Sequence, residues 1–320
     1  MEYAFDISII VPAFNEKESL PELVAWIGRV MEQEGRSYEV IIVDDGSTDG
    51  SWETISALAK ERPEVHGIRF RRNYGKSAAL YCGFKEAAGR VVFTMDADLQ
   101  DSPDELPEMY RMVVEDGWEV VSGWKQHRKD NKLTKNLPSK LYNATARAIT
   151  GIKLHDMNCG LKAYNAEVVK NIEVYGEMHR YIPYLAKNAG FSRITEKPVH
   201  HQKRKYGTSK FGMERFVNGF LDLLSLWFLS TFGKKPMHFF GYTGLFMFLV
   251  GFVMTLWIII TKLVHQSAGT YYRAVTEQPL FYLALVAVIL GVMLFLAGFI
   301  SELVSRSSPE RNNYNITAKL

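Results

Sequence analysis

Short apolar runs alternate with stretches of helical periodicity in the N-terminal part of the chain. Five runs rich in Val and Ile predict strands: Ile7 to Ala13, Val40 to Val43, Gly67 to Phe70, Val91 to Met95 and Glu119 to Ser122. Four intervening stretches predict helices: Glu18 to Glu32, Trp52 to Arg62, Lys76 to Ala88 and Asp104 to Glu115. Near-continuous apolar strands that alternate with helices are typical of a mostly parallel sheet covered on both faces. The pattern therefore predicts an α/β fold.

The hydrophobic pattern changes after Pro236. No Asp, Glu, Lys or Arg occurs from Pro236 to Thr261 or from Gln278 to Ser301. At about 1.5 Å per residue, either segment is long enough to cross a hydrocarbon core roughly 30 Å thick. A buried helix of a soluble protein is the alternative, but two such segments in succession, joined by a short polar loop, favour a transmembrane hairpin.

The segment from Gly212 to Ser230 has a third pattern. Its polar residues recur at intervals of three and four: Arg215, Asn218, Asp222 and Ser225. This spacing predicts an amphipathic helix. Packing on its own domain is the usual arrangement, but a basic loop before the helix and a span after it favour a position at the membrane interface.

These patterns divide the 320 residues into four parts. We expect an α/β domain at 1–205, a loop end and juxtamembrane helix at 206–235, two spans within 236–302 (about 236–261 and 278–301), and a tail at 303–320. Basic residues flank the outer ends of the spans: Lys234, Lys235, Arg306, Arg311 and Lys319. By the positive-inside rule, we expect both termini and the α/β domain to lie in the cytoplasm, and the chain to be integral to the inner membrane. Two cysteines and no signal peptide at the first strand agree with a reducing compartment.

Candidate chemistry begins at the end of the fourth predicted strand, where Asp96 and Asp98 are followed by Gln100. Two carboxylates two residues apart in a loop can face one hard divalent cation, and the Gln amide adds a neutral oxygen. Such a cation would bridge phosphate oxygens. The alternative is a solvated turn after a strand, because an Asp-x-Asp tripeptide also occurs by chance.

Polar residues also follow the three preceding strands. They are Pro12, Asn15 and Glu16, then Asp44, Asp45, Gly46 and Ser47, then Asn73, Tyr74, Gly75 and Lys76. Ligands of parallel sheets bind outside the carboxyl ends of the strands, so these clusters predict one site. Helix caps at Ser47 and Asp49 and a simple turn at Asn73 to Gly75 are the alternatives.

The ordered segments Ile10 to Glu16, Val43 to Asp49, Asn73 to Lys76 and Asp96 to Asp101 resemble the motifs of family 2 glycosyltransferases of the GT-A fold. The resemblance continues through His155 to Lys162 and Arg204 to Lys210. It is strongest to the polyprenyl-phosphate glycosyltransferases, the dolichol-phosphate mannosyltransferase-like and GtrB-like branch. It covers nearly the whole chain, including the hairpin.

The resemblance implies roles for the donor-side residues. The nucleotide-sugar pocket would be formed by Pro12, Asn15, Glu16, Asp44, Asp45, Lys76 and Asp96. Mg²⁺ or Mn²⁺ would be held against the diphosphate by Asp96, Asp98 and Gln100. A metal there neutralises charge on the leaving nucleoside diphosphate, which makes Asp98 catalytic as well as a ligand.

The acceptor side is predicted from basic segments. The segment from Lys203 to Lys210 has four Lys or Arg residues and no acid, and the resemblance assigns acceptor-phosphate binding to Arg204, Ser209 and Lys210. A charge run attracted to anionic lipid heads is the alternative. Lys125 and Arg128 are further candidates, although related enzymes often carry arginine at Lys125 and lysine acts only as a point charge. An exposed loop is the alternative there.

Asp156 is the remaining candidate catalytic carboxylate. A lipid monophosphate already carries a nucleophilic oxyanion, so strong base catalysis is unnecessary. The resemblance gives Asp156 an orienting role, with a structural role before the next strand as the alternative.

The resemblance implies inverting transfer of one sugar, as by a hexosyltransferase, from a UDP- or GDP-sugar to undecaprenyl or dolichyl phosphate. A polysaccharide synthase is disfavoured, because those enzymes carry a Gln-x-x-Arg-Trp motif and Gln202 is followed by Lys203, Arg204, Lys205 and Tyr206. A catalytically silent membrane protein that binds nucleotide sugar or lipid is the other alternative. No nucleic-acid partner is expected. Span glycines permit the close packing of a homo-oligomer without specifying it.

Overall fold

The computed structural model describes residues 3–126, 146–147, 150–202, 205–206, 227–228, 231–232, 236–271, 273–307 and 316–320. These residues form two compact units, one within Met1–Leu223 together with Arg311–Leu320 and the other within Leu224–Glu310.

An eight-stranded sheet lies at the centre of the first unit, in the order β7-β5-β6-β4-β1-β2-β3-β8. Its strands are β1 (Phe5–Ala13), β2 (Tyr38–Asp44), β3 (Val65–Phe70), β4 (Gly89–Thr94), β5 (Val120–Trp124), β6 (Lys162–Asn165), β7 (Ile194–Pro198) and β8 (Ile316–Lys319). Neighbouring pairs are parallel except where β6 or β8 takes part. The predicted mostly parallel α/β sheet is therefore confirmed.

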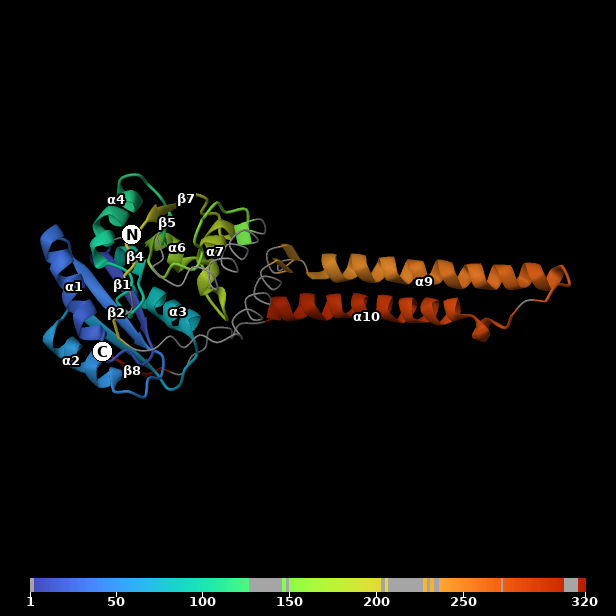
Figure 1. Cartoon of the computed structure of the whole chain (residues 1–320), viewed down its shortest axis with the longest axis horizontal. Coiled ribbons are helices and arrows are strands. Elements are labelled where there is room, and N and C mark those ends of the chain that lie inside the picture. Colours follow the sequence, from blue (N-terminus) through green and yellow to red (C-terminus); the bar gives the residue numbers. More distant parts are fainter. Residues whose placement is uncertain are drawn as a thin grey trace. The chain divides into compact units, whose positions relative to one another are not determined.

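Helices cover both faces of this sheet, as Figure 1 shows. They are α1 (Leu20–Glu34), α2 (Ser51–Glu61), α3 (Lys76–Glu86), η1 (Pro103–Glu105), α4 (Leu106–Val114), α6 (Ala166–Lys170), η2 (Met178–Tyr181) and α7 (Ile182–Asn188). All four predicted helices are present. The C-terminal end of α1 can be read from the sequence, because Gly35 caps the helix in a left-handed conformation with φ 61°.

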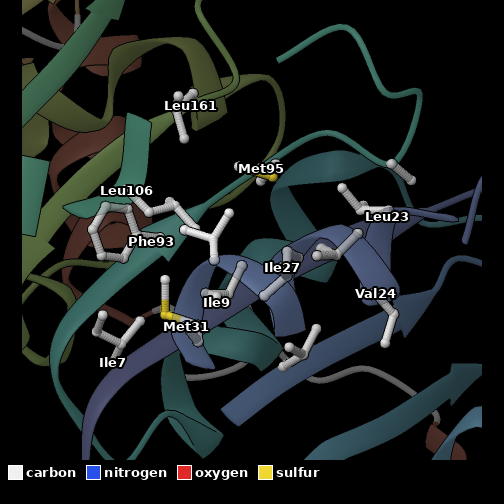
Figure 2. Packing of buried hydrophobic residues seen from close by; sticks show 14 of the residues in the cluster. Ile7, Ile9, Leu23, Val24, Ile27, Met31, Phe93, Met95, Leu106 and Leu161 are labelled. Carbon is white, nitrogen blue, oxygen red and sulfur yellow. The ribbon is translucent and has the colours of Figure 1, made fainter. Parts of the chain in front are cut away.

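The core explains why the strands are apolar on both sides. Ile7 and Ile9 of β1 and Phe93 of β4 pack with Ile27 of α1 and Leu106 of α4 on one face (Figure 2). On the other face, α3 approaches β1 so closely that a side chain at Gly83 would meet Ile10. Burial on both faces is the dominant stabilising term of such a sheet.

The C-terminal strand β8 is a feature that the hydrophobic pattern did not predict. It pairs antiparallel with β3, and Leu320 exchanges backbone hydrogen bonds with Gly67 (2.8 and 2.5 Å). The end of the predicted tail is thus part of the eight-stranded sheet.

The second unit contains two long helices, α9 (Pro236–Ser267) and α10 (Pro279–Ser307), joined through η3 (Val275–Glu277). Pro236–Ser267 and Pro279–Ser301 each contain an 18-residue stretch of high mean hydropathy (2.4 and 2.9), and both helices are long enough to cross a membrane. Gly244 of α9 would place a Cβ 2.7 Å from the Gly291 carbonyl oxygen of α10, so the helices pack backbone to backbone. Most of the predicted amphipathic helix at Gly212 to Ser230 lies outside the described residues.

Candidate active site

Four parallel strands, β1 to β4, deliver polar loops to one edge of the sheet. Asp45, directly after β2, joins two of these loops because its carboxylate accepts hydrogen bonds from the Tyr74 and Gly75 amides (2.6 and 2.9 Å). The Asp45 amide in turn donates to the Ala13 carbonyl at the end of β1 (2.8 Å). Burial raises the pKa of Asp45 to about 6, although the two amides oppose this shift.

Three other residues that we predicted to bind the nucleoside hold the same loops in place through hydrogen bonds. The fully buried Asp44 accepts a hydrogen bond from the Ser47 amide (3.0 Å) and lies 3.6 Å from the Arg69 Nε. Asn15, with φ 56°, accepts from the Thr48 amide (2.8 Å). The Glu16 amide donates to Ser51 Oγ (3.0 Å).

Pro12 lies one residue before the end of β1, where it pairs with Val43 of β2. The structure thus brings Pro12 and those three residues together with Asp45 at one strand edge, and their contacts with a nucleoside stay a prediction.

Asp96, just beyond β4, is held from two sides. Its carboxylate forms an ion pair with Lys76, the first residue of α3. On the other side is Gly160, whose missing side chain makes room for it: a Cβ there would lie 2.6 Å from Asp96 Cγ and 2.9 Å from Oδ1. Burial alone would raise the pKa of Asp96, but Lys76 and Lys125 lower it to about 2. Asp96 is therefore an anionic oxygen donor at neutral pH.

Asp98 and Gln100 share a short loop with Asp96. Asp98 is 9% exposed and accepts a hydrogen bond from the Gln100 amide (3.2 Å), while the intervening Leu99 has φ 58°. Within the described residues, no three His, Cys, Asp or Glu side chains form a metal cluster. The loop instead offers two carboxylates and one amide oxygen, a hard donor set that suits Mg²⁺ or Mn²⁺ when diphosphate oxygens complete the shell.

A cavity of about 320 Å³ opens beside Asp96. Its polar lining comes from Lys76, Asp96, Asn158, Lys162, His179 and Arg180. Lys162 is buried and donates to the Cys159 carbonyl, and burial lowers its pKa. Burial also lowers the pKa of His179 well below its usual value, as do Lys76 and Arg180, so this imidazole is neutral at physiological pH.

Asp156 lies in the loop before β6, close to this cavity. It is 3% exposed and accepts a hydrogen bond from the amide of Asn158, a cavity residue (3.1 Å). Its carboxylate also interacts electrostatically with Lys162. This position is compatible with the orienting role that we predicted.

The predicted acceptor residues are only partly described. Arg128, Arg204, Ser209 and Lys210 lie outside the described residues. Lys125 is described, and its ammonium lies 2.8 Å from the Oδ1 of Asp101, a buried carboxylate. Direct contact between Lys125 and an acceptor phosphate stays a prediction.

Sequence reasoning gave no role to Gly160, Lys162, His179 or Arg180. Gly160 and Lys162 belong to the motif from His155 to Lys162, so the sequence singled out their segment without indicating what either residue does. His179 and Arg180 come from η2, a short element without periodicity, and only the fold brings them to Asp96.

Comparisons with known proteins identify the family of the chain. Residues 8–173 match the family model described as glycosyl transferase family 2. Dodecaprenyl-phosphate galacturonate synthase of Rhizobium johnstonii is 33% identical over 307 residues, covering 95% of this chain and 89% of the relative. Undecaprenyl-phosphate 4-deoxy-4-formamido-L-arabinose transferase of Shewanella sediminis is 34% identical, covering 94% and 87%.

Solved structures show the same fold. Glucosyl-3-phosphoglycerate synthase from Mycobacterium tuberculosis, in complex with Mn²⁺, uridine-diphosphate-glucose and phosphoglyceric acid, matches with a TM-score of 0.52 at 17% identity, over 71% of this chain and 80% of that chain. Mannosyl-3-phosphoglycerate synthase from Rubrobacter xylanophilus matches with a TM-score of 0.54 at 16% identity, over 70% and 74%.

Proposed function

The chain belongs to glycosyltransferase family 2, and from this premise we propose that it transfers one sugar from a UDP- or GDP-linked donor to a polyprenyl phosphate at the cytoplasmic face of a membrane. One observation carries the proposal. The strand edge that holds Asp45, Asp96 and Asp98 belongs to a chain whose relatives, over nearly its full length, are named as polyprenyl-phosphate sugar transferases.

The donor binds along the strand edge. Asp45 and the loops that it joins hold the nucleoside, because the buried Asp45 carboxylate, which accepts a hydrogen bond from the Tyr74 amide, can accept another from a base N–H. The sugar lies toward the cavity beside Asp96, where Asn158 and the neutral His179 supply hydrogen-bonding groups. Hexosyl transfer stays a prediction, since the relatives named above act on galacturonate and on a substituted arabinose.

Asp96, Asp98 and Gln100 hold Mg²⁺ or Mn²⁺ when the donor is bound. The ion supplies electrostatic stabilisation of the leaving diphosphate. Lys76, which forms an ion pair with Asp96, would supply a positive charge beside the diphosphate.

The reaction is a displacement at the anomeric carbon. A phosphate oxygen of the lipid attacks this carbon, the bond to the diphosphate oxygen breaks, and the nucleoside diphosphate leaves with the bonding electrons. Attack opposite the leaving group inverts the configuration. The nucleophile is already an anion, so Asp156 orients the acceptor or a sugar hydroxyl and removes no proton from the nucleophile.

The two apolar helices anchor the chain in the membrane, and β8, which follows α10 in the sequence, pairs with β3 of the sheet that holds the active site. Because β8 belongs to the same sheet as the active site, the chain re-enters the cytoplasm after the second span. This topology keeps both termini cytoplasmic, as the basic residues that flank the spans also favour.

The proposal is tested with the purified chain in lipid nanodiscs, Mn²⁺, undecaprenyl phosphate and a panel of UDP- and GDP-sugars. We expect the nucleoside diphosphate to be released with one donor only when the lipid phosphate is present. Lipid-independent hydrolysis with every donor, or no release at all, would contradict the transferase assignment.

A further inference from the structure

Glu196 holds the start of the loop that precedes β6. This glutamate lies in β7, and its carboxylate accepts hydrogen bonds from the backbone amide of His155 (2.7 Å) and from the Nδ1 of the same residue. The His155 ring also stacks on the indole of Trp124, the last residue of β5, with the ring centroids 4.3 Å apart. Two neighbouring strands therefore fix the orientation of His155. We call residues 155–160, which begin at this contact, the Asp156 turn.

The sheet holds the other end of the Asp156 turn. Thr94 Oγ1 of β4 donates a hydrogen bond to the Gly160 carbonyl (2.8 Å), and the Gly123 amide of β5 donates to the Leu161 carbonyl (2.9 Å). The turn is thus attached to β4 and β5 at its end and to β7 at its start. Both hydrogen bonds to β7 at its start are accepted by one side chain, that of Glu196.

The contact between His155 and Glu196 lies near the surface, whereas the next residue of the turn is buried. The side chains of His155 and Glu196 are 59% and 15% exposed, and Asp156 is 3% exposed. We expect removal of the Glu196 carboxylate to cost little folding stability, because it takes no apolar side chain out of the core. Its effect falls instead on the position of the turn.

Asn158 is the residue through which the turn meets the cavity beside Asp96. Its amide donates to Asp156 Oδ1 (3.1 Å), and its side chain is part of the cavity lining. Among the described residues, no hydrogen-bond partner reaches its Oδ1, which is buried. A buried acceptor without a partner costs free energy, and a bound ligand recovers this free energy when it supplies a hydroxyl donor. The hydroxyls of a sugar are donors of this kind.

We propose that Glu196 is a positioning residue which, through His155, holds the Asp156 turn so that Asn158 Oδ1 accepts a hydrogen bond from a hydroxyl of the donor sugar. This inference rests on the proposed function, in which the sugar lies in the cavity beside Asp96. Neither Glu196 nor His155 is among the described residues that line this cavity, so their effect on the sugar passes through the turn.

The role of Glu196 can be separated from a purely structural one by the choice of ligand and of substitution. A free nucleoside diphosphate has no sugar, so its affinity does not depend on the position of Asn158. Glu196→Ala removes both hydrogen bonds to His155. Glu196→Gln keeps them, because its carbonyl oxygen accepts from the backbone amide and its NH₂ group donates to the Nδ1 of a neutral imidazole that carries its proton on Nε2.

The experiment measures dissociation constants by calorimetry for the full chain in nanodiscs with Mn²⁺ and without acceptor lipid. Wild type is first titrated with UDP-glucose, UDP-galacturonate and GDP-mannose, and the one that binds most tightly is compared with its free nucleotide on every variant. The variants are Glu196→Ala, Glu196→Gln, Asn158→Ala and the double variant Glu196→Ala/Asn158→Ala. Glu119→Ala is the matched control, because Glu119 also accepts a backbone amide, that of Arg193 (2.8 Å), but next to the first residue of β5, at the opposite end of that strand from Trp124.

For Glu196→Ala we expect the dissociation constant of the nucleotide sugar to rise about fivefold, as for the loss of one neutral hydrogen bond, and that of the free nucleotide to stay within about twofold of wild type. Asn158→Ala should cause the same selective loss, and the double variant no further loss, because both changes remove one interaction. Glu196→Gln and Glu119→Ala should bind both ligands as wild type does.

Three results would overturn the inference. Equal weakening of both ligands by Glu196→Ala would leave Glu196 a structural role only. Losses that add up in the double variant would mean that Glu196 acts independently of Asn158. A Glu196→Ala variant that binds the nucleotide sugar as tightly as wild type would mean that the turn does not need this contact. Transfer to undecaprenyl phosphate by the same wild-type sample tests the proposed function separately, because its absence contradicts transfer while the affinities still decide the role of Glu196.

Discussion

Gly160→Ala is predicted to impair catalysis through one added methyl group. The new Cβ would lie 2.6 Å from Asp96 Cγ and 2.9 Å from Oδ1, whereas ordinary contact begins at 3.4 Å. Asp96 is a short side chain already paired with Lys76, so its carboxylate must withdraw by about 0.8 Å, the difference between 2.6 and 3.4 Å. A misplacement of about 1 Å at a reacting centre costs on the order of 100-fold in rate. We therefore expect kcat/KM to fall about 100-fold, equivalent to about 2.7 kcal/mol.

The assay is transfer to undecaprenyl phosphate as a function of Mn²⁺ concentration. A displaced ligand should raise the Mn²⁺ concentration for half-maximal activity along with the loss of kcat/KM. Gly28→Ala is the matched control, because its Cβ would meet only side-chain atoms of Arg62 and Tyr38, at 3.0 and 3.4 Å. If Gly160→Ala keeps both values within twofold of wild type, the placement of Asp96 against Gly160 is wrong.

Three further predictions test other parts of the structure. Asp98→Ala should abolish transfer, whereas the exposed carboxylate change Asp116→Ala should leave it near wild type, and an active Asp98→Ala enzyme would contradict the metal assignment. The pKa of Asp45 is raised to about 6, so its carboxylate becomes protonated as the pH falls through 6. The KM for the donor should therefore rise by up to about tenfold per pH unit below 6. Asp45→Asn should bind the donor weakly, with an affinity that changes little with pH. Gly244→Ile should lower the melting temperature of the full chain in detergent, because its Cβ would lie 2.7 Å from a backbone oxygen of α10, whereas Gly241→Ala, whose nearest neighbour is a Met237 methyl at 3.4 Å, should not.

Much of the fold followed from local pattern. The first five strands and the four helices between them repeat a periodicity that burial on both sheet faces imposes. The strand β7 was not predicted, and β6 was expected only as a strand without bounds after Asp156, because both are short, with four and five residues, and carry lysines among their apolar positions. The strand β8 escaped because an edge strand gains its order from β3 rather than from its own sequence.

The site shows the same division. Asp96, Asp98 and Asp45 follow strands, so their position at one edge could be deduced from the rule for parallel sheets. Lys125 looked like an exposed basic residue in a charge run, and only the fold places it against the buried Asp101. Likewise, the reason for glycine at position 160 is a contact with Asp96, a residue far away in the sequence. Tertiary contacts of this kind leave no local periodicity.

The most direct test of polyprenyl-phosphate sugar transfer is the product itself. The full chain in nanodiscs is incubated with Mn²⁺, undecaprenyl phosphate and each nucleotide sugar of the panel, and the lipid fraction is analysed by mass spectrometry. The account predicts undecaprenyl phosphate enlarged by the mass of one sugar residue, with one nucleoside diphosphate released per lipid modified. Nucleoside diphosphate released without any change in the mass of the lipid, or a lipid bearing a chain of sugars, would contradict it.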